Sequence, residues 1–286
     1  MALTISYLRT MSSGVGVLLL LAPCIALAES PSETRISPSD LVKAVIYNEL
    51  HPPINSDVRW KYRLDKEVTG KQETREVIET KSGSLDRLLL VAGKPLPGAQ
   101  ASDESERILR FSHSPEDQRE AEQARRKDAE QCNGLLRMIP DAFVFEYAGE
   151  SGTLTRVTFK PNPRFRPPSR EGKVLQQMVG EMWVDARQKR LASINGQLIN
   201  EVKFGGGLLG HLEKGGQFTV QRAELAPGVW EVTDMTVNMR GRALLFKSIC
   251  VQQKERHSNF ERVADDLSLA DAANLLLRQT LVAAKQ

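Results

Sequence analysis

Residues 217–239 read QFTVQRAELAPGVWEVTDMTVNM, and this stretch decides the fold class. Apolar and polar side chains alternate on both sides of Pro227-Gly228, which is the pattern of half-buried strands joined by a tight turn. A tight turn joins only antiparallel neighbours, because parallel strands need a much longer crossover. Gly215-Gly216 and Gly241 mark similar turns on either side. We therefore expect antiparallel strands over 217–225, 229–239 and 243–253.

The same alternation extends upstream. It is longest at 192–204, ASINGQLINEVKF. One parity holds the apolar residues Ala192, Ile194, Leu198, Val202 and Phe204, and the other holds the polar residues Ser193, Asn195, Gln197, Glu201 and Lys203. Further strands are predicted at 58–64, 73–81, 85–91, 143–147, 157–159 and 174–185. Helices do not alternate with these strands, as they would in a wound parallel sheet, so the pattern favours segregated helices and strands.

Helix signals occur at the start, in the middle and at the end of the chain. Ser37-Pro38 begins an amphipathic helix that Pro52-Pro53 ends, and Ser268 begins a final helix. Residues 102–137 are dense in Glu, Arg, Gln and Ala and contain a second helix start at Ser114, which predicts a charged, solvated helical insertion rather than a binding surface. We predict an α+β fold: a large curved antiparallel sheet of about 9–11 strands with N-terminal, inserted and C-terminal helices.

Residues 1–28 have the features of an export signal. A positively charged start is followed by the apolar run Val15–Ala22 and by Ala26-Leu27-Ala28, the small-x-small pattern that signal peptidase cleaves. A retained membrane anchor is the alternative, but the run is far shorter than the ~20 residues of a spanning helix. We therefore expect a periplasmic mature chain that begins near Glu29.

Cys24 allows one further alternative, a lipidated N-terminus. We do not favour it, because Pro23 fixes the backbone at the position where a lipoprotein peptidase needs an unconstrained small residue. Removal of the signal leaves Cys132 and Cys250 in a compartment where disulfides persist. The sequence leaves two alternatives open for them, a disulfide that closes a long loop and a pair of buried free thiols.

Composition and motifs argue against several function classes. The formal net charge is +3, and basic and acidic residues alternate along the chain, so we expect no nucleic-acid partner. None of the histidines, His51, His113, His211 and His257, has metal-ligand spacing with another ligand residue. No serine has the glycine-flanked elbow of an esterase, and Gly205–Gly210 lacks the Lys-Ser/Thr ending of a phosphate loop. We expect a protein that is not an enzyme and that uses no metal or cofactor.

Methionines on two predicted strands are the candidate ligand-binding residues. Met178 and Met182 share one strand face, and Met235 and Met239 share a face of a later strand. Methionine adapts to irregular ligands, but it also fills ordinary cores. Both interpretations remain open from the sequence.

The middle of the strand series contains the run Met182-Trp183-Val184-Asp185, then Arg190-Leu191, then Ile194-Asn195-Gly196. This run resembles the periplasmic lipoprotein-carrier superfamily that includes LolA, LolB and RseB. The resemblance implies an incomplete barrel, closed by helices, whose cavity accepts acyl chains. It also implies one half-barrel domain over 29–286 that carries the insertion at 102–137. Met178, Met182, Met235 and Met239 would then line the cavity, with Trp183 and Trp230 either lining it or packing under helices.

Two functions follow as expectations. The first is a periplasmic carrier or binding protein of the bacterial envelope, with a lipid or a lipidated protein as its ligand. The second is a non-enzymatic regulatory module that holds an envelope protein in the same fold. Leu208 and Leu209 lie between glycines, and we predict that they contact a membrane surface or a lipidated partner peripherally. The alternative is that both leucines are buried under the sheet as a local core.

Overall fold

The computed structural model describes residues 36–52, 58–207, 210–242 and 251–283, which belong to one compact unit starting at Ile36. The helices are α1 (Pro38–Leu50), α2 (Gly98–His113), α3 (Pro115–Ala142), α4 (Arg170–Leu175) and α5 (Leu269–Ala283), with a short 3-10 turn η2 (Gly205–Gly207). The strands of the main sheet are β1 (Trp60–Val68), β2 (Lys71–Thr80), β3 (Gly83–Val91), β4 (Lys94–Pro95), β5 (Phe143–Ser151), β6 (Leu154–Pro161), β7 (Met178–Asp185), β8 (Arg190–Leu198), β11 (Gln217–Ala226), β12 (Val229–Met239) and β14 (Val251–Arg262). A small second sheet contains β9 (Val202–Phe204), β10 (Gly210–Leu212) and β13 (Gly241–Arg242).

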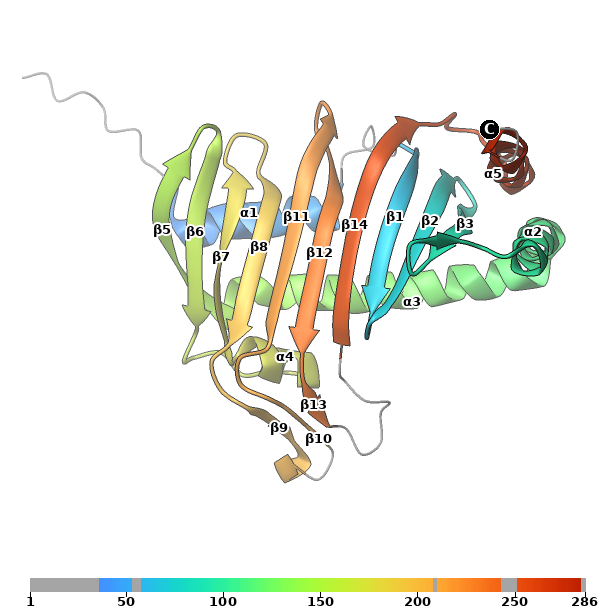
Figure 1. The fold of residues 1–286 in the computed structure, drawn as a ribbon. Helices are drawn as coiled ribbons and strands as arrows, with labels where there is room; N and C mark the ends of the chain where they lie inside the picture. Colours follow the sequence, from blue (N-terminus) through green and yellow to red (C-terminus); the bar gives the residue numbers. More distant parts are fainter. Residues whose placement is uncertain (1–35, 53–57, 208–209, 243–250, 284–286) are drawn as a thin grey trace, which may run out of the picture. The chain divides into compact units, whose positions relative to one another are not determined.

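The main sheet has 11 strands in the order β4-β3-β2-β1-β14-β12-β11-β8-β7-β6-β5, and it is curved but not closed into a barrel (Figure 1). It consists of two antiparallel meanders, β1 to β4 and β5 to β14, which α2 and α3 connect along the chain. The meanders join where β1 pairs with β14 over Trp60–Val68. The predicted α+β fold class, with a large antiparallel sheet and helices at the start, middle and end, is confirmed.

Serine caps begin the helices where the sequence predicts them. The side chain of Ser37 accepts a hydrogen bond from the backbone N–H of Asp40, and Ser114 does the same for Asp117. Ser268 accepts from the backbone N–H of Asp271 at the start of α5. Each cap satisfies a backbone donor that the first helical turn leaves unpaired. The charged insertion is therefore two helices, α2 and α3, that meet at Ser114.

The hydrophobic core divides between the two faces of the main sheet. One cluster packs Leu41, Val45 and the rest of the apolar stripe of α1 against β5 to β8, and we call this side the α1 face. The other cluster packs α5 and Ile108 of α2 against Ile78 and Leu85 of β2 and β3, on the opposite face. Figure 1 shows α1 and α3 behind the strands and α5 beside the end of the sheet that contains β2 and β3. The sheet is thus covered on different faces at its two ends.

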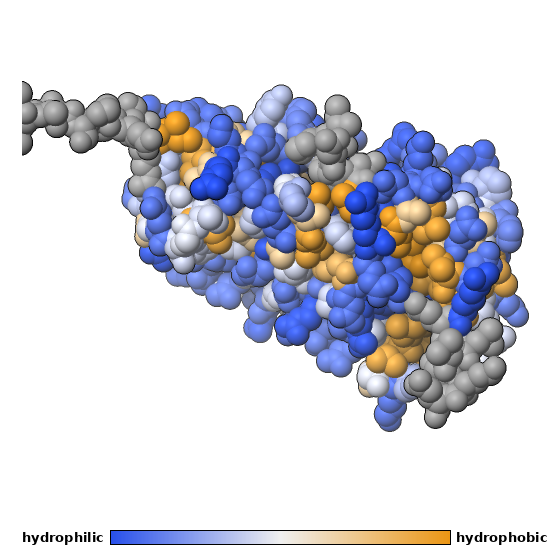
Figure 2. Space-filling view, turned by 90° about the horizontal axis from the view of Figure 1, so that it is seen from above, coloured by the Kyte–Doolittle hydropathy of each residue, from blue (hydrophilic) through white to orange (hydrophobic). Residues whose placement is uncertain are grey.

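The α5 end also carries exposed apolar side chains. Seen from above, polar side chains dominate the surface, and the larger apolar patch lies toward this end (Figure 2). Val91 of β3, Leu109 of α2 and Leu275 of α5 are each exposed. In the part of the chain that the structure describes, no helix is long and apolar enough to cross a membrane.

Three details of the predicted strand series are wrong. Residues 192–204 are not one strand, because β8 ends at Leu198 and β9 starts at Val202 in the second sheet. The alternation continues across the break since Leu198, Val202 and Phe204 are all buried in the same core. Gly241 is not a turn residue but part of β13, where a Cβ atom would lie 2.1 Å from the carbonyl oxygen of His211.

The third detail concerns the last strand. The alternation predicts a strand over 243–253. The predicted end is wrong, because β14 (Val251–Arg262) continues to Arg262, and the predicted part at 243–250 lies outside the described residues. The alternation of apolar and polar residues is weak in β14, because its side chains after Val251 are mostly polar, QQKERHSNFER. A central strand with so polar a sequence marks an unusual region of this sheet.

Candidate functional site

Half-buried apolar side chains form a strip on the α1 face of the central strands, which we call the apolar strip. It consists of Phe218 and Val220 of β11 and of Val237 and Met235 of β12, paired in register in that order. On the same face, Val220 pairs in register with Ile194 of β8, and Ile194 pairs with Met182 of β7. Met182 belongs to the core that packs against α1, and Ile194 packs against that core. The apolar strip therefore extends the main core beyond α1 and stays partly open to solvent.

Helix α3 spans the α1 face without packing on the middle strands. Its C-terminal part contacts α1, α4 and β5, and α2 contacts it as well. Residues 123–132 are all exposed, and Figure 1 shows the helix running behind the sheet from one end to the other. A helix that is polar all round typically bridges separate contacts instead of covering a core. The middle turns of α3 thus leave the apolar strip uncovered.

The C-terminal end of α1 is fixed by a buried ion cluster. The Glu49 carboxylate lies 2.6 Å from Nη1 of Arg222 and 3.3 Å from Nε of Arg190, and these three side chains are only 8–13% exposed. The same carboxylate accepts the backbone N–H of Leu191. Breaking such a cluster would leave a buried charge unpaired, which is costly. The cluster therefore fixes where the covered core ends and the apolar strip begins.

Polar side chains continue from the apolar strip across β14 and β1. Glu255 pairs in register with Met235 and forms an ion pair with Lys66, with 2.7 Å between Oε1 and Nζ. Nε2 of His257 lies 3.7 Å from Oε2 of Glu255, and the His257 ring stacks on Tyr62, with ring centroids 5.1 Å apart. The nearby His257 imidazole lowers the pKa of Glu255 to about 2, helped by Lys66 and opposed by burial. Glu255 is thus firmly ionised next to the apolar strip.

Two glutamates farther along have the opposite shift. Burial raises the pKa of Glu79 and of Glu231, although each accepts a hydrogen bond from Trp60. The Trp60 backbone N–H donates to Glu79 over 3.0 Å, and its indole N–H donates to Glu231 over 3.2 Å. Burial and these carboxylates also raise the pKa of Tyr62. At this end of the α1 face, Glu79, Glu231 and Tyr62 therefore release their protons at a higher pH than exposed side chains of the same types.

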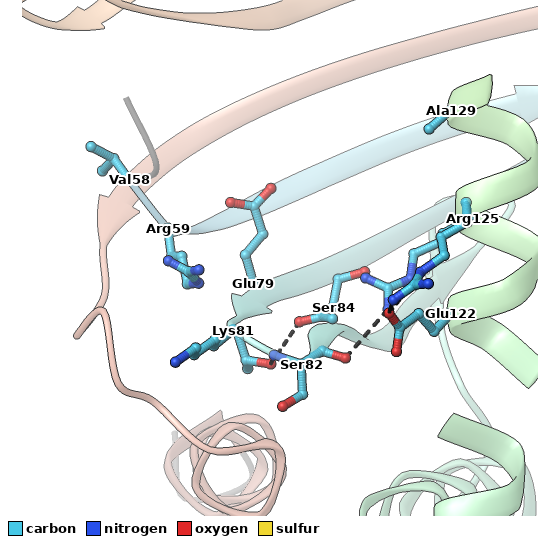
Figure 3. A pocket seen from close by; sticks show the side chains of 12 residues that line it. Val58, Arg59, Glu79, Lys81, Ser82, Ser84, Glu122, Arg125 and Ala129 are labelled. Carbon is cyan, nitrogen blue, oxygen red and sulfur yellow. Dashed lines mark hydrogen bonds and ion pairs between the residues drawn. The ribbon is translucent and has the colours of Figure 1, made fainter. Parts of the chain in front are cut away.

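A cavity of about 560 Å³ lies at this end, between the β2–β3 turn and α3 (Figure 3). Its lining consists of Val58, Arg59, Glu79, Thr80, Lys81, Ser82, Gly83, Ser84, Glu122, Arg125, Arg126 and Ala129. Figure 3 shows Arg59 and Lys81 on one side and Arg125 and Glu122 reaching in from α3 on the other. Glu79 belongs both to this lining and to the contacts of Trp60, so the cavity adjoins the polar end of the α1 face.

The predicted methionines share the α1 face but differ in burial. Met178 and Met182 are 3% and 1% exposed within the main core, so α1 would have to move before a ligand could reach them. Met235 and Met239 are half-buried, and Met239 packs at the margin of the core. Met235 is therefore the predicted lining residue that lies most clearly within the accessible apolar strip.

The predicted tryptophans do not join this group. Trp183 lies on the opposite face of the sheet from its neighbour Met182, where the Arg156 guanidinium lies 5.8 Å from its ring centroid. Trp230 is half-buried near the start of β12, and its indole N–H donates to Oε1 of Gln188 over 3.0 Å. Trp183 therefore does not face the same site as the methionines.

Other predicted residues lie partly outside the described chain. Leu208 and Leu209 are not among the described residues, and neither are Cys24, Cys250 and the export signal at 1–28. Cys132 is exposed on α3, so it is not the buried thiol of the second alternative, and the first alternative, a disulfide with Cys250, is untested. Within the described residues, no group of three His, Cys, Asp or Glu side chains could hold a metal ion.

Sequence reasoning misses several residues of this site. It identifies Tyr62 only as a strand residue, it ends the last strand before His257, and it assigns Arg125 to a solvated helix face. The usable signal is the polar sequence of β14 next to strongly alternating strands, because a central strand that carries Glu255 and His257 must place polar groups against an apolar face.

Comparison with known proteins adds little to this geometry. No protein-family model and no curated protein matches the chain. A solved structure of a DUF1329 family protein from Desulfovibrio piger is 13% identical with a TM-score of 0.30, covering 84% of this chain and 100% of that one. The structure of MucB in complex with MucA(peri) is 11% identical with a TM-score of 0.21, covering 83% of this chain and 97% of that one. Similarities this low carry no weight for function, and the resemblance to the lipoprotein carriers stays a prediction.

Proposed function

We propose that the protein is an exported, non-enzymatic binding protein that holds an apolar chain on the apolar strip, between the sheet and α3. The ligand class is a lipid, or the lipid-modified end of a protein. Export follows from the signal pattern in residues 1–28, and the ligand class follows from the side chains that are accessible on the α1 face.

The observation that carries the proposal is the continuity of the apolar strip with the core. A protein gains stability by covering such side chains, and the core under α1 buries Met182, on the next strand but one from Val220. Here α3 passes over the sheet with its middle residues exposed, and it leaves Phe218, Val220 and Met235 half-buried. Covering each remaining half side chain would contribute about 1 kcal/mol to ligand binding. The strip has no directional groups, so it suits a flexible apolar ligand.

A titration with a fluorescent fatty acid, cis-parinaric acid, tests the proposal on the purified protein and two variants. Met235→Lys places a charge in the apolar strip, and we expect a loss of affinity of at least about tenfold. Thr236→Lys is the matched control, because the adjacent exposed side chain points to the other face of the same strand. Thermal unfolding should show that both variants fold. Equal binding by the wild type and Met235→Lys would contradict the proposal.

A partner-binding module is the second candidate, and strand β5 favours it. β5 is an edge strand of the main sheet, and its Val144 is 39% exposed. Edge strands offer unpaired backbone groups to an added strand from another protein. A wild-type protein that binds no fatty acid in the same titration would favour this second function.

A further inference from the structure

We infer that the cavity between the β2–β3 turn and α3 binds the anionic group, a phosphate or a carboxylate, of the ligand whose apolar chain lies on the apolar strip. This inference rests on the proposed function and makes it more specific, because it names the ligand as an anionic amphiphile. Three features of the cavity support it: its charges, the backbone shape of its turn and its position beside the apolar strip.

The charges around the cavity are predominantly basic. Four basic side chains and two glutamates line it. Glu122 is paired with Arg126, with 2.5 Å between Oε1 and Nη2, so this pair adds little net charge. The other charged side chains of the lining are three basic ones, Arg59, Lys81 and Arg125, against the single carboxylate of Glu79. The field inside the cavity therefore favours an anion.

Arg125 is the side chain best suited to bind it, and Lys81 adds a positive charge to the lining. Arg125 donates through Nη2 to the backbone carbonyl of Ser82 over 3.3 Å, and a neutral carbonyl does not compensate its charge. The planar guanidinium keeps other N–H donors for a phosphate or carboxylate, which it matches in geometry. Lys81 lines the cavity from the β2–β3 turn on the side away from Arg125, and Ser82 and Ser84 add hydroxyl donors to the lining (Figure 3).

The turn is shaped to admit the Arg125 side chain. Gly83 has a φ of +135°, and a Cβ atom at this position would lie 2.5 Å from Nη2 of Arg125. Any other residue would push the guanidinium away from the turn or strain the backbone. Gly83 thus holds open the place from which Arg125 reaches the cavity.

The cavity is connected to the apolar strip by consecutive contacts on the α1 face. Glu79 binds the backbone of Trp60, and the next side chain on that face of β1, Tyr62, stacks on His257. His257 lies beside Glu255, the register partner of Met235. An amphiphile with its chain on the strip can therefore place its charged end toward the cavity.

The test compares four probes on the full protein: dodecyl phosphate, dodecanoate, the neutral monododecanoyl glycerol, and inorganic phosphate. We expect the two anionic amphiphiles to displace cis-parinaric acid at lower concentrations than the neutral one, and inorganic phosphate alone to displace it poorly. Arg125→Gln and Lys81→Gln should each weaken the anionic amphiphiles by roughly tenfold and leave the neutral one unchanged. Lys127→Gln is the control, because Lys127 is exposed on α3 and does not line the cavity.

The outcomes separate the inference from the function beneath it. If no probe with an apolar chain binds the wild type, the proposed function fails. If all three amphiphiles bind equally well, and Arg125→Gln and Lys81→Gln behave like Lys127→Gln, the binding function holds and the headgroup assignment is overturned. Inorganic phosphate that binds as tightly as dodecyl phosphate would also overturn it, because the cavity would then serve a free anion.

Discussion

Gly180 sets the packing of β7 because no side chain fits at its position. A Cβ atom there would lie 2.0 Å from the backbone oxygen of Asn195 and 2.6 Å from Cζ of Phe159. Gly180→Ala should therefore destabilise the protein by about 3 kcal/mol, since the clash is with backbone as well as with a core ring. Gly134→Ala in α3 meets nothing within 4 Å and should instead stabilise the helix by about 0.5–1 kcal/mol. Urea unfolding of both variants checks this, and a Gly180→Ala protein as stable as the wild type would show that β7 can shift.

Glu255 should make the folded state sensitive to acid. Its pKa is about 2 in the folded protein against an ordinary value of 4.5, so the ionised carboxylate contributes stability that is fully present above pH 4.5. That contribution is lost as the pH falls from 4.5 toward 2, and we expect it to be on the order of 2 kcal/mol. Unfolding at pH 5 and pH 3 should show a smaller loss of stability for Glu255→Gln than for the wild type. Glu106→Gln, an exposed change on α2, is the control, and an unchanged loss in Glu255→Gln would refute the assignment.

Residue types alone predict part of the site. The two pairs of methionines share one face of the sheet. Strand alternation places the two members of each pair on the same side of their strand, and the strand register from β7 to β12 places both pairs on the same face. The roles of Glu79, Tyr62 and His257 could not be predicted in this way. Their contacts join β1, β2 and β14, which are adjacent in the sheet but, for β14, nearly two hundred residues away in the sequence.

At the scale of the elements, α2 and α3 connect the two meanders but do not by themselves hold them together. β1 pairs with β14 along its length, and α5 packs on β2 and β3. Limited proteolysis should nick the chain between 102 and 115, most readily at the α2–α3 junction around Ser114. The two fragments should still migrate as one species in gel filtration. Their separation into independently folded pieces would contradict the single-sheet architecture.

Helix positions are the most predictable elements, and strand ends are the least. Ser37, Ser114 and Ser268 act locally, because a cap needs only the first turn that follows it. The break between β8 and β9 depends on the second sheet instead. Leu198 exchanges backbone hydrogen bonds with Gly215 and Gly216, and β9 then pairs with β10. The alternation of apolar and polar residues over 192–204 does not indicate which residues are these hydrogen-bond partners.

For the whole molecule, the antiparallel class follows from the tight turns, whereas the site arises from the long-range arrangement. The inserted helix α3 passes over a sheet whose central strands belong to both ends of the chain. The sequence predicts a solvated surface for this insertion, and residues 123–132 are indeed exposed. In the proposed function, α3 matters for the two features beside it: the apolar strip that it leaves uncovered and the basic cavity that its Arg125 lines.

Photoaffinity mapping tests the binding of an apolar chain on the apolar strip most directly. A fatty acid with a diazirine near the end of its chain would be bound to the intact protein, activated by light, and located by mass spectrometry of the peptides. We expect adducts on residues 217–226 and 229–239, the strands that carry the apolar strip, and competition by excess unlabelled fatty acid. Adducts confined to the exposed apolar side chains of the α5 end, or to the opposite face around Trp183, would contradict binding at this site.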